Sequence, residues 1–186
     1  MSKLSSEEFW NRQFDIGGNE PAWWFTTAFS LRTAADVLES FQGPLMSQVK
    51  TKVTRSDYEQ QSIKRVHAML LAMAMECLLK ALWLKYGGTL AKGGKYIRIP
   101  SAKDHRLDQL AVAVSLKGDI NFPPQELELL ERASFWITSG RYPIPRKSRD
   151  NLARQKPLIG DPFAGLRTLI QKLERELGSK MNFDPE

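Results

Sequence analysis

The pattern of apolar and polar positions along the chain predicts an all-α protein. Apolar residues recur every three or four positions over several stretches, and no stretch alternates convincingly in the way of a half-buried strand. Glycine, proline and helix-capping residues mark the ends of these stretches. They predict a bundle of about five helices, at 22–41, 57–86, 104–114, 123–139 and 161–178.

The second predicted helix is the longest and the most apolar. Its central stripe consists of Ile63, Val66, Leu70, Met73, Cys77, Ala81 and Leu84. Further apolar residues widen the stripe until almost the whole C-terminal half is apolar, which places this helix in the middle of the bundle. Residues 68–84 are apolar except for Glu76 and Lys80, but this run is short for a membrane span and contains two charges. We therefore interpret it as a buried helix of a soluble protein.

The chain has the length and composition of one globular domain, with 186 residues of which 42% are apolar. We expect a polar N-terminal lead-in at 1–20, a single helical domain at 21–178 and a frayed C-terminus at 179–186. The connection 87–103 is rich in glycine and lysine, and we expect it to hold at most a short extended piece at 96–99.

Cysteine and histidine are scarce in this sequence. Cys77 is the only cysteine, which excludes an intrachain disulfide, and His67 and His105 are too few to complete an ordinary zinc site. The N-terminus lacks the apolar core of a signal peptide. These features predict a cytoplasmic protein with no metal, no cofactor and no membrane partner.

Positive charge is concentrated in two predicted loops. The net charge is +6, yet segment 141–156 holds six basic residues and one acidic residue, and segment 92–106 holds five and one. Long loops of this kind are often functional. One interpretation is a phosphate-binding surface on which Tyr96 and Tyr142 stack with bases. The other is a pair of solvated basic loops without a specific partner.

Two further motifs have features of functional sites. The run from Gly88 to Lys95 resembles a phosphate-binding P-loop, but it fails the required spacing and follows a helix rather than a strand. Glu76 and Lys80 are four residues apart in the order that favours an ion pair. Because they lie in the most apolar helix, each needs a partner, which is either the other or His105 or Arg141 from elsewhere. Alternatively, they line a polar notch that opens onto the basic loops.

Three segments, in this order along the chain, resemble the HEPN family of helical domains found in toxin–antitoxin and defence systems. The first is Ala-Met-Glu-Cys-Leu-Leu-Lys-Ala-Leu-Trp at 74–83. The second is Asp-His-Arg-Leu-Asp-Gln-Leu at 104–110, similar to the family's His-x-Leu-x-x-Leu. The third is Arg-Tyr-Pro at 141–143. The resemblance implies an up-and-down helical bundle that forms a homodimer.

The resemblance also bears on catalysis. Many members of the family are metal-independent ribonucleases with an Arg, four to six residues and then a His near the start of the last helix. This chain has no histidine after His105, so its last helix lacks that motif. Arg98 and His105 do have this spacing, but they precede the middle helices. The resemblance therefore implies a non-catalytic version that binds RNA or nucleotides or that partners a separately encoded nucleotidyltransferase.

Our leading hypothesis is binding of RNA or a nucleotide by the two basic loops and a polar centre. The expected binding residues are Glu76, Lys80, Lys95, Arg98, His105, Arg141, Tyr142, Arg146, Lys147 and Arg149. One alternative is a ribonuclease in which Arg98 and His105 are catalytic. Another is a protein-interaction module, such as an antitoxin or a subunit of a defence complex, with an exposed apolar face around Trp23 and Trp24.

Overall fold

The computed structural model describes residues 5–40, 55–141 and 161–178, and for residues 56–58 and 139–141 it describes the backbone alone. The helices in these ranges are α1 (Ser6–Gly18), α2 (Pro21–Ser40), α3 (Arg55–Lys85), α4 (Leu107–Lys117), α5 (Pro124–Arg141) and α7 (Pro162–Gly178). Two-residue strands, β1 (Ala91–Lys92) and β2 (Lys95–Tyr96), form one hairpin. The prediction of an all-α helical bundle is confirmed.

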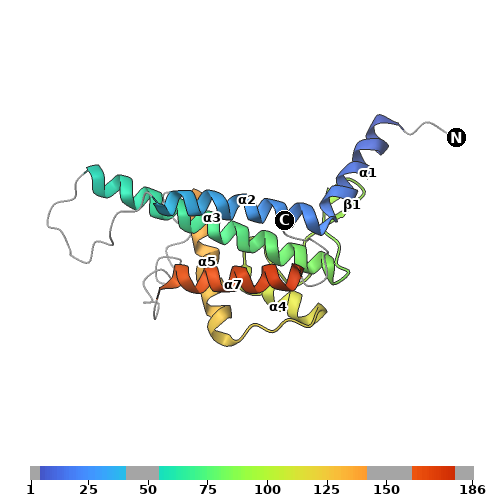
Figure 1. The fold of residues 1–186 in the computed structure, drawn as a ribbon. Helices are drawn as coiled ribbons and strands as arrows, with labels where there is room; N and C mark the ends of the chain where they lie inside the picture. Colours follow the sequence, from blue (N-terminus) through green and yellow to red (C-terminus); the bar gives the residue numbers. More distant parts are fainter. Residues whose placement is uncertain (1–4, 41–54, 142–160, 179–186) are drawn as a thin grey trace.

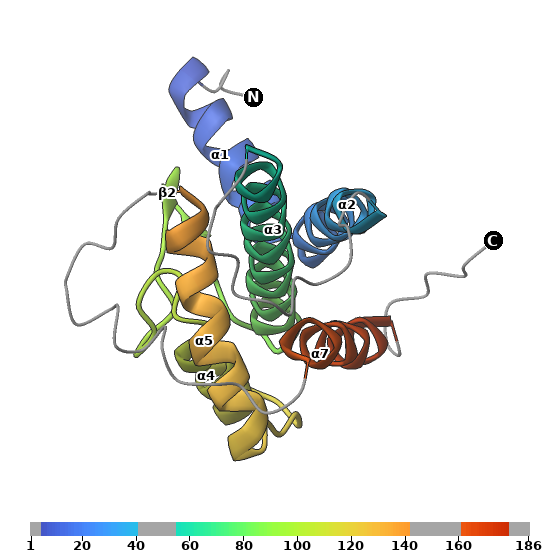
Figure 2. The same ribbon diagram turned by 90° about the vertical axis from the view of Figure 1, so that its left-hand side faces the viewer.

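Helix α3 is the centre of the bundle. It packs along α2 and also contacts α4, α5 and α7, so that neighbours surround it when the bundle is seen along the α3 axis (Figures 1 and 2). Its most buried large side chains are Leu71, Met75, Leu78, Leu79 and Leu82. The core therefore centres on positions beside the predicted stripe.

The predicted stripe is correct only in its C-terminal part. Ala81 and Leu84 are buried, whereas Leu70 and Cys77 are half-buried and Val66 is 37% exposed. Since nearly every face of this helix is apolar, hydrophobicity alone does not identify the face with the closest neighbours. The approach of the surrounding helices decides it.

By length and composition, the stretch Glu59–Lys85 of α3 could cross a membrane. However, 67% of its most apolar window is buried inside the bundle. The core helix of a folded domain passes the same compositional test, and the burial matches the interpretation of this segment as a core helix.

Ion pairs join α2 to α7 along the outside of the bundle. Arg32 contacts both carboxylate oxygens of Glu174, at 2.6 and 2.7 Å. Arg167 of α7 reaches Asp36 and Glu39 of α2, each at 2.5 Å. Every charged side chain of α2 is thus directed at α7, which leaves the other exposed side of α2 without charge.

The N-terminal lead-in expected at 1–20 is corrected by the structure, since most of it is the helix α1. Ser5 accepts a hydrogen bond from the backbone N–H of Glu8, and the Glu8 carboxylate accepts one from the N–H of Ser5. This capping box satisfies two backbone donors at the helix start. Helix α1 projects from one end of the bundle (Figure 1).

The hairpin anchors α1 to the rest of the protein. Gly93 and Gly94 form its two-residue turn with φ of +63° and +73°, which glycine adopts without a steric penalty. Both glycine N–H groups donate to the Asp15 carboxylate, at 2.7 and 3.0 Å. The resemblance of this segment to a P-loop is therefore superficial. In a P-loop the backbone N–H groups bind phosphate, whereas here those of Gly93 and Gly94 bind the carboxylate of Asp15.

Asn19 makes the second link between α1 and the hairpin. Its side-chain oxygen accepts hydrogen bonds from the N–H groups of Leu90 and Ala91, at 2.8 and 3.1 Å. Its side-chain nitrogen donates to the carbonyl of Ala91, at 2.7 Å. The amide thus pairs with the edge of β1 as a strand would.

We predict that truncating the core of α3 costs much more stability than truncating an exposed leucine. Leu79 is 0% exposed and Leu116 of α4 is 84% exposed. The Leu79→Ala variant should lose about 2–5 kcal/mol of unfolding free energy, from lost burial and the cavity left behind. Leu116→Ala should change it by less than about 0.5 kcal/mol. Urea denaturation of both variants checks this, and equal losses would contradict the assignment of the core.

Candidate functional site

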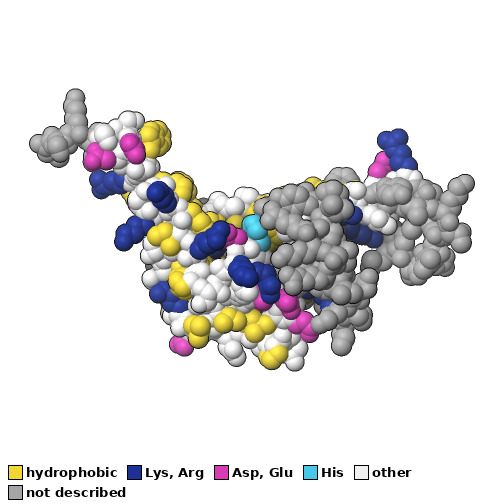
Figure 3. Space-filling view, turned by 180° about the vertical axis from the view of Figure 1, so that it is seen from behind, with side chains coloured by type: hydrophobic (Ala, Val, Ile, Leu, Met, Phe, Trp, Pro, Cys, Tyr) yellow, Lys and Arg dark blue, Asp and Glu magenta, His cyan; other side chains and the backbone are white. Residues whose placement is uncertain are grey.

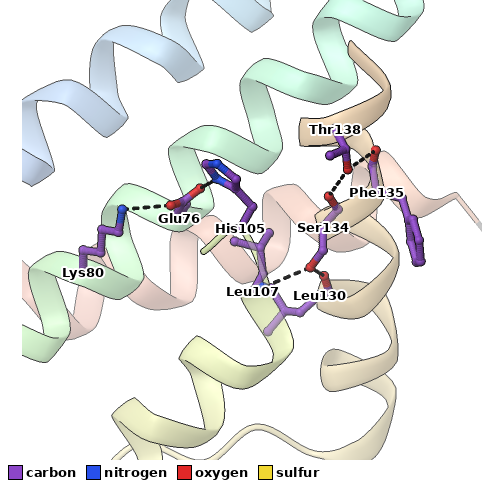
Figure 4. Close-up of polar contacts among 8 residues, drawn as sticks. All are labelled: Glu76, Lys80, His105, Leu107, Leu130, Ser134, Phe135 and Thr138. Carbon is purple, nitrogen blue, oxygen red and sulfur yellow. Dashed lines mark hydrogen bonds and ion pairs between the residues drawn. The ribbon is translucent and has the colours of Figure 1, made fainter. Parts of the chain in front are cut away.

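Three of the predicted site residues meet at a polar centre, which we define as Glu76, Lys80 and His105. The Glu76 carboxylate lies 2.8 Å from the Lys80 ammonium and 2.9 Å from Nδ1 of His105. Figure 4 shows the Glu76 carboxylate between the side chains of Lys80 and His105. The sequence left the partner of Glu76 open, and the structure supplies two of the candidates.

The backbone before α4 positions His105 against α3. His105 has a φ of +64°, in the left-handed region that non-glycine residues seldom occupy. Two residues later, the N–H of Leu107 donates to the hydroxyl of Ser134, which itself donates to the carbonyl of Leu130 (Figure 4). The Ser134 side chain of α5 therefore accepts a hydrogen bond from a backbone N–H group in the first turn of α4.

This arrangement corrects the predicted start of α4. The sequence predicted a helix from residue 104, but the helix begins at Leu107, its capping position is Arg106, and the Arg106 side chain makes no capping hydrogen bond. Arg106 instead pairs with Asp108, at 2.8 Å, while Asp104 pairs with Arg98, at 3.1 Å. The sequence contains no local signal for Ser134, which is distant along the chain.

The charges of the polar centre stabilise one another in a largely buried position. Burial alone would raise the pKa of Glu76, but the hydrogen bond from His105 and the charge of Lys80 outweigh it and lower the pKa to about 2. Burial alone would lower the pKa of Lys80, but the attraction of Glu76 outweighs it and raises the pKa. Glu76 and Lys80 are therefore both charged near neutral pH.

Two aromatic rings complete the surroundings of Lys80. Its ammonium lies 4.8 Å from the ring centroid of Trp24 on α2 and 5.4 Å from that of Tyr96 on β2. Both distances suit a cation–π interaction. The sequence predicted a role for Tyr96, whereas Trp24 was assigned only to an exposed apolar face. Trp24 is instead half-buried and packs against the core.

Among the described residues, only some of the basic side chains of loop 92–106 form ion pairs with carboxylates. Arg98 and Arg106 contact carboxylates, as described above. The side chains of Lys92, Lys95 and Lys103 are exposed and have no anionic partner among the residues that the structure describes. Among the described residues, no hydrogen bond or ion pair joins Arg98 to His105. Arg98 contacts the carboxylate of Asp104, and His105 contacts that of Glu76.

The second basic loop lies outside the described residues. This applies to Tyr142, Arg146, Lys147 and Arg149. Arg141 is the last residue of α5, and its side chain is likewise outside the description. The predicted role of segment 141–156 therefore stays a prediction.

The remaining nucleophilic and metal-ligating groups lie mainly in the core. Burial raises the pKa of Cys77 to about 11, which disfavours the thiolate needed for nucleophilic chemistry. His67 is buried, with Nε2 at 3.4 Å from a guanidinium nitrogen of Arg167 and Nδ1 without a partner among the described residues. Within the described ranges, no cluster of three metal-ligating side chains occurs.

Two cavities open near these residues, and their charges differ. One, of about 380 Å³, lies where α1, the start of α2 and the hairpin meet, and it adjoins the rings of Trp24 and Tyr96. The larger, of about 630 Å³, lies between α4 and α5. Three carboxylates, those of Asp108, Glu128 and Glu131, and one ammonium, that of Lys117, line the larger cavity, and this excess of negative charge disfavours an anionic ligand there.

We predict that Glu76 makes stability depend on acid pH. Its pKa is about 2 in the folded protein against 4.5 in the unfolded chain, so its contribution is complete above pH 4.5 and is lost as the pH falls toward 2. This contribution is on the order of 3 kcal/mol. Chemical denaturation between about pH 5.5 and pH 3 should therefore show a smaller loss of stability for Glu76→Gln than for the wild type.

A matched control for this measurement is Glu7→Gln, which neutralises an exposed carboxylate of α1. Its pH dependence should follow the wild type. The Glu76→Gln variant should also be less stable at pH 7, because the Lys80 ammonium loses its buried partner. Parallel pH dependence of Glu76→Gln and the wild type would contradict the role given to Glu76.

In comparisons with known proteins, no protein-family model, no curated protein and no solved structure matches this chain. The similarity to HEPN domains therefore rests on the three sequence segments alone.

Proposed function

We propose that this protein is a cytoplasmic, HEPN-like helical bundle that binds RNA or nucleotides without cleaving them. The binding surface combines the polar centre, loop 92–106 and the basic segment 141–156. The resemblance assigns this activity to a toxin–antitoxin or phage-defence system, with an antitoxin or a separately encoded nucleotidyltransferase as a partner.

The observation that supports binding most directly is the surroundings of Lys80. A buried ammonium is held against two aromatic rings, and the ring of Tyr96 belongs to the same hairpin that exposes Lys92 and Lys95. Cations bind phosphates, and exposed rings stack with bases. The combination of both on one short hairpin favours a nucleic acid or nucleotide over an acidic protein.

The contacts of Arg98 and His105, the residues expected to be catalytic in a ribonuclease, favour binding over catalysis. The guanidinium of Arg98 is paired with Asp104, and Nδ1 of His105 is paired with Glu76. A ribonuclease would need both side chains to reach the same phosphodiester. The ribonuclease alternative keeps one favourable feature, since a carboxylate orients the imidazole of His105 as in many general bases.

We predict that removing two hairpin lysines weakens RNA binding and its dependence on salt. For the double variant Lys92→Ala with Lys95→Ala, the slope of log affinity against log salt should fall by about 1.4, at about 0.7 for each phosphate contact with a single strand. Fluorescence anisotropy with a labelled oligouridylate at several salt concentrations measures the slope. The triple variant Arg146→Ala, Lys147→Ala, Arg149→Ala should act in the same direction.

The double variant Lys64→Ala with Arg65→Ala, on the N-terminal half of α3, is the matched control and should leave the slope unchanged. Binding that is indifferent to salt and to the hairpin lysines would overturn the proposal. Incubation of the same RNA in EDTA separates the ribonuclease alternative. Cleavage by the wild type that is lost in a folded His105→Ala variant would establish that alternative instead.

A second candidate function, a protein-interaction module, is favoured by the outer strip of α2. This strip consists of Thr26, Ser30, Thr33, Ala34 and Val37, all exposed and uncharged. Phe29 lies at its edge, where the Arg32 guanidinium is 5.2 Å from the centroid of the ring. The strip runs along a helix of about 30 Å. Two copies of one face can pair about a twofold axis when the face has no like charges to bring together. A homodimer through this strip is therefore the partner that this candidate proposes.

We predict that Ala34→Glu, in the middle of the strip, converts the dimer to a monomer. Two carboxylates would face each other across the twofold axis, while the exposed position leaves the fold intact. Size-exclusion chromatography with light scattering measures the mass, and Arg175→Glu on the exposed side of α7 serves as a control. A wild type that is monomeric at all concentrations would contradict the proposed dimer.

A further inference from the structure

The cavity beside the hairpin has walls made mainly of aromatic rings. The rings that line it belong to Phe14 on α1, Trp23 and Trp24 on α2, and Tyr96 on β2. Its volume of about 380 Å³ lies at the lower end of the range of small-ligand sites. Trp23, Phe14 and Tyr96 are 66%, 47% and 43% exposed, so their faces are open to a ligand from solvent.

Two adjacent glycines allow these walls to approach one another. A Cβ atom on Gly17 would lie 2.8 Å from the ring of Trp23, and one on Gly18 would lie 2.6 Å from the Cβ of Ala91. A larger residue at Gly17 would displace the ring of Trp23, and one at Gly18 would push β1 away from α1. The indole N–H of Trp24 also donates to the carbonyl of Gly18, at 3.0 Å. The cavity is therefore shaped before a ligand arrives.

The charges around the cavity decide the class of ligand. Aromatic cages often bind cations, but the ammonium of Lys80 already lies over the rings of Trp24 and Tyr96 and takes the place that a ligand cation would occupy on them. Arg12, Lys92 and Lys95 are exposed and adjoin lining residues in the sequence. Figure 3 shows Lys and Arg side chains among hydrophobic ones where α1 meets the body of the protein.

Asp15 is the carboxylate at the hairpin turn, where it accepts hydrogen bonds from the N–H groups of Gly93 and Gly94 and keeps its negative charge. It offsets one of the three exposed basic charges, so an excess of positive charge is left among these side chains. The charge of Glu76 is balanced by Lys80 within the polar centre. A planar ligand with an attached negative charge therefore fits this site better than a cation or a purely apolar molecule.

We propose that this cavity binds one unpaired nucleobase, which stacks on the exposed rings of Trp23 and Tyr96 while its phosphates contact Lys92 and Lys95. This inference rests on the proposed function and narrows its ligand to single-stranded RNA or a free nucleotide. A base inside a double helix is stacked on both faces and does not enter such a site. The contribution of stacking is independent of salt, in contrast to that of the lysines.

The decisive variant is Trp23→Ala, with Trp10→Ala as its control. Both tryptophans are 66% exposed, but only Trp23 lines the cavity. Loss of one stacked base should weaken binding of a short oligouridylate by about 5- to 150-fold, with an unchanged salt slope. Trp10→Ala should change the affinity by less than about twofold. A duplex of the same length should bind weakly to the wild type and be insensitive to Trp23→Ala.

Two further measurements keep the test independent of folding and identify the contact. Thr27→Phe fills the cavity from an exposed position and leaves its aromatic walls in place, so it should weaken binding as Trp23→Ala does. An oligonucleotide containing 5-iodouridine should crosslink to Trp23, Tyr96 or Phe14 on irradiation, as mapped by mass spectrometry.

The outcomes separate this inference from the proposed function. RNA binding that depends on Lys92 and Lys95 but not on Trp23 or Thr27, with crosslinks elsewhere, would overturn the base site and leave the proposed function intact. No binding of RNA or mononucleotide at any salt concentration would overturn both. If Trp23→Ala alters only the mass measured by light scattering, the cavity is part of a protein interface and the inference is wrong.

Discussion

The structure depends on one constraint, which is that the C-terminal half of α3 is apolar on nearly every side. Such a helix is stable in water only when neighbours cover it all round. Helices α2, α4, α5 and α7 supply that cover, and each packs against α3 directly. Helices α2 and α7 are also joined to each other by ion pairs, so on that side of α3 both apolar contacts and ion pairs hold the surrounding helices in place.

The same constraint explains the polar centre. A buried carboxylate and a buried ammonium within an apolar helix are costly unless each is paired and hydrogen-bonded. Glu76 and Lys80 pair with each other, and the remaining capacity of the carboxylate is met by His105. The loop that carries His105 is thereby held against the helix, and the hairpin and Trp24 close over Lys80. Structural stability and the candidate binding surface are thus built from the same residues.

The helices were largely predictable because their signals are local. The apolar period, the Gly and Pro boundaries and the length of the central helix all lie within single segments of the chain. Helix α1 had a local signal as well, the Ser5 and Glu8 capping box, although the polar character of the segment led us to expect only a polar lead-in there. The pairing of Glu76 with Lys80 was also predictable, since four residues on a helix bring two side chains together.

The sequence alone therefore determined the helical class, the central helix and the spacing that pairs Glu76 with Lys80, and the structure added His105 to that pair. Tertiary structure decided which of the described cations in loop 92–106 are paired, because Asp104 and Asp108 contact Arg98 and Arg106 in a way that the spacing does not specify. It also decided that Trp23, Trp24, Phe14 and Tyr96 share one cavity. Those four residues come from three separate elements, and only the folding of α1 and the hairpin onto the end of α2 brings their rings together.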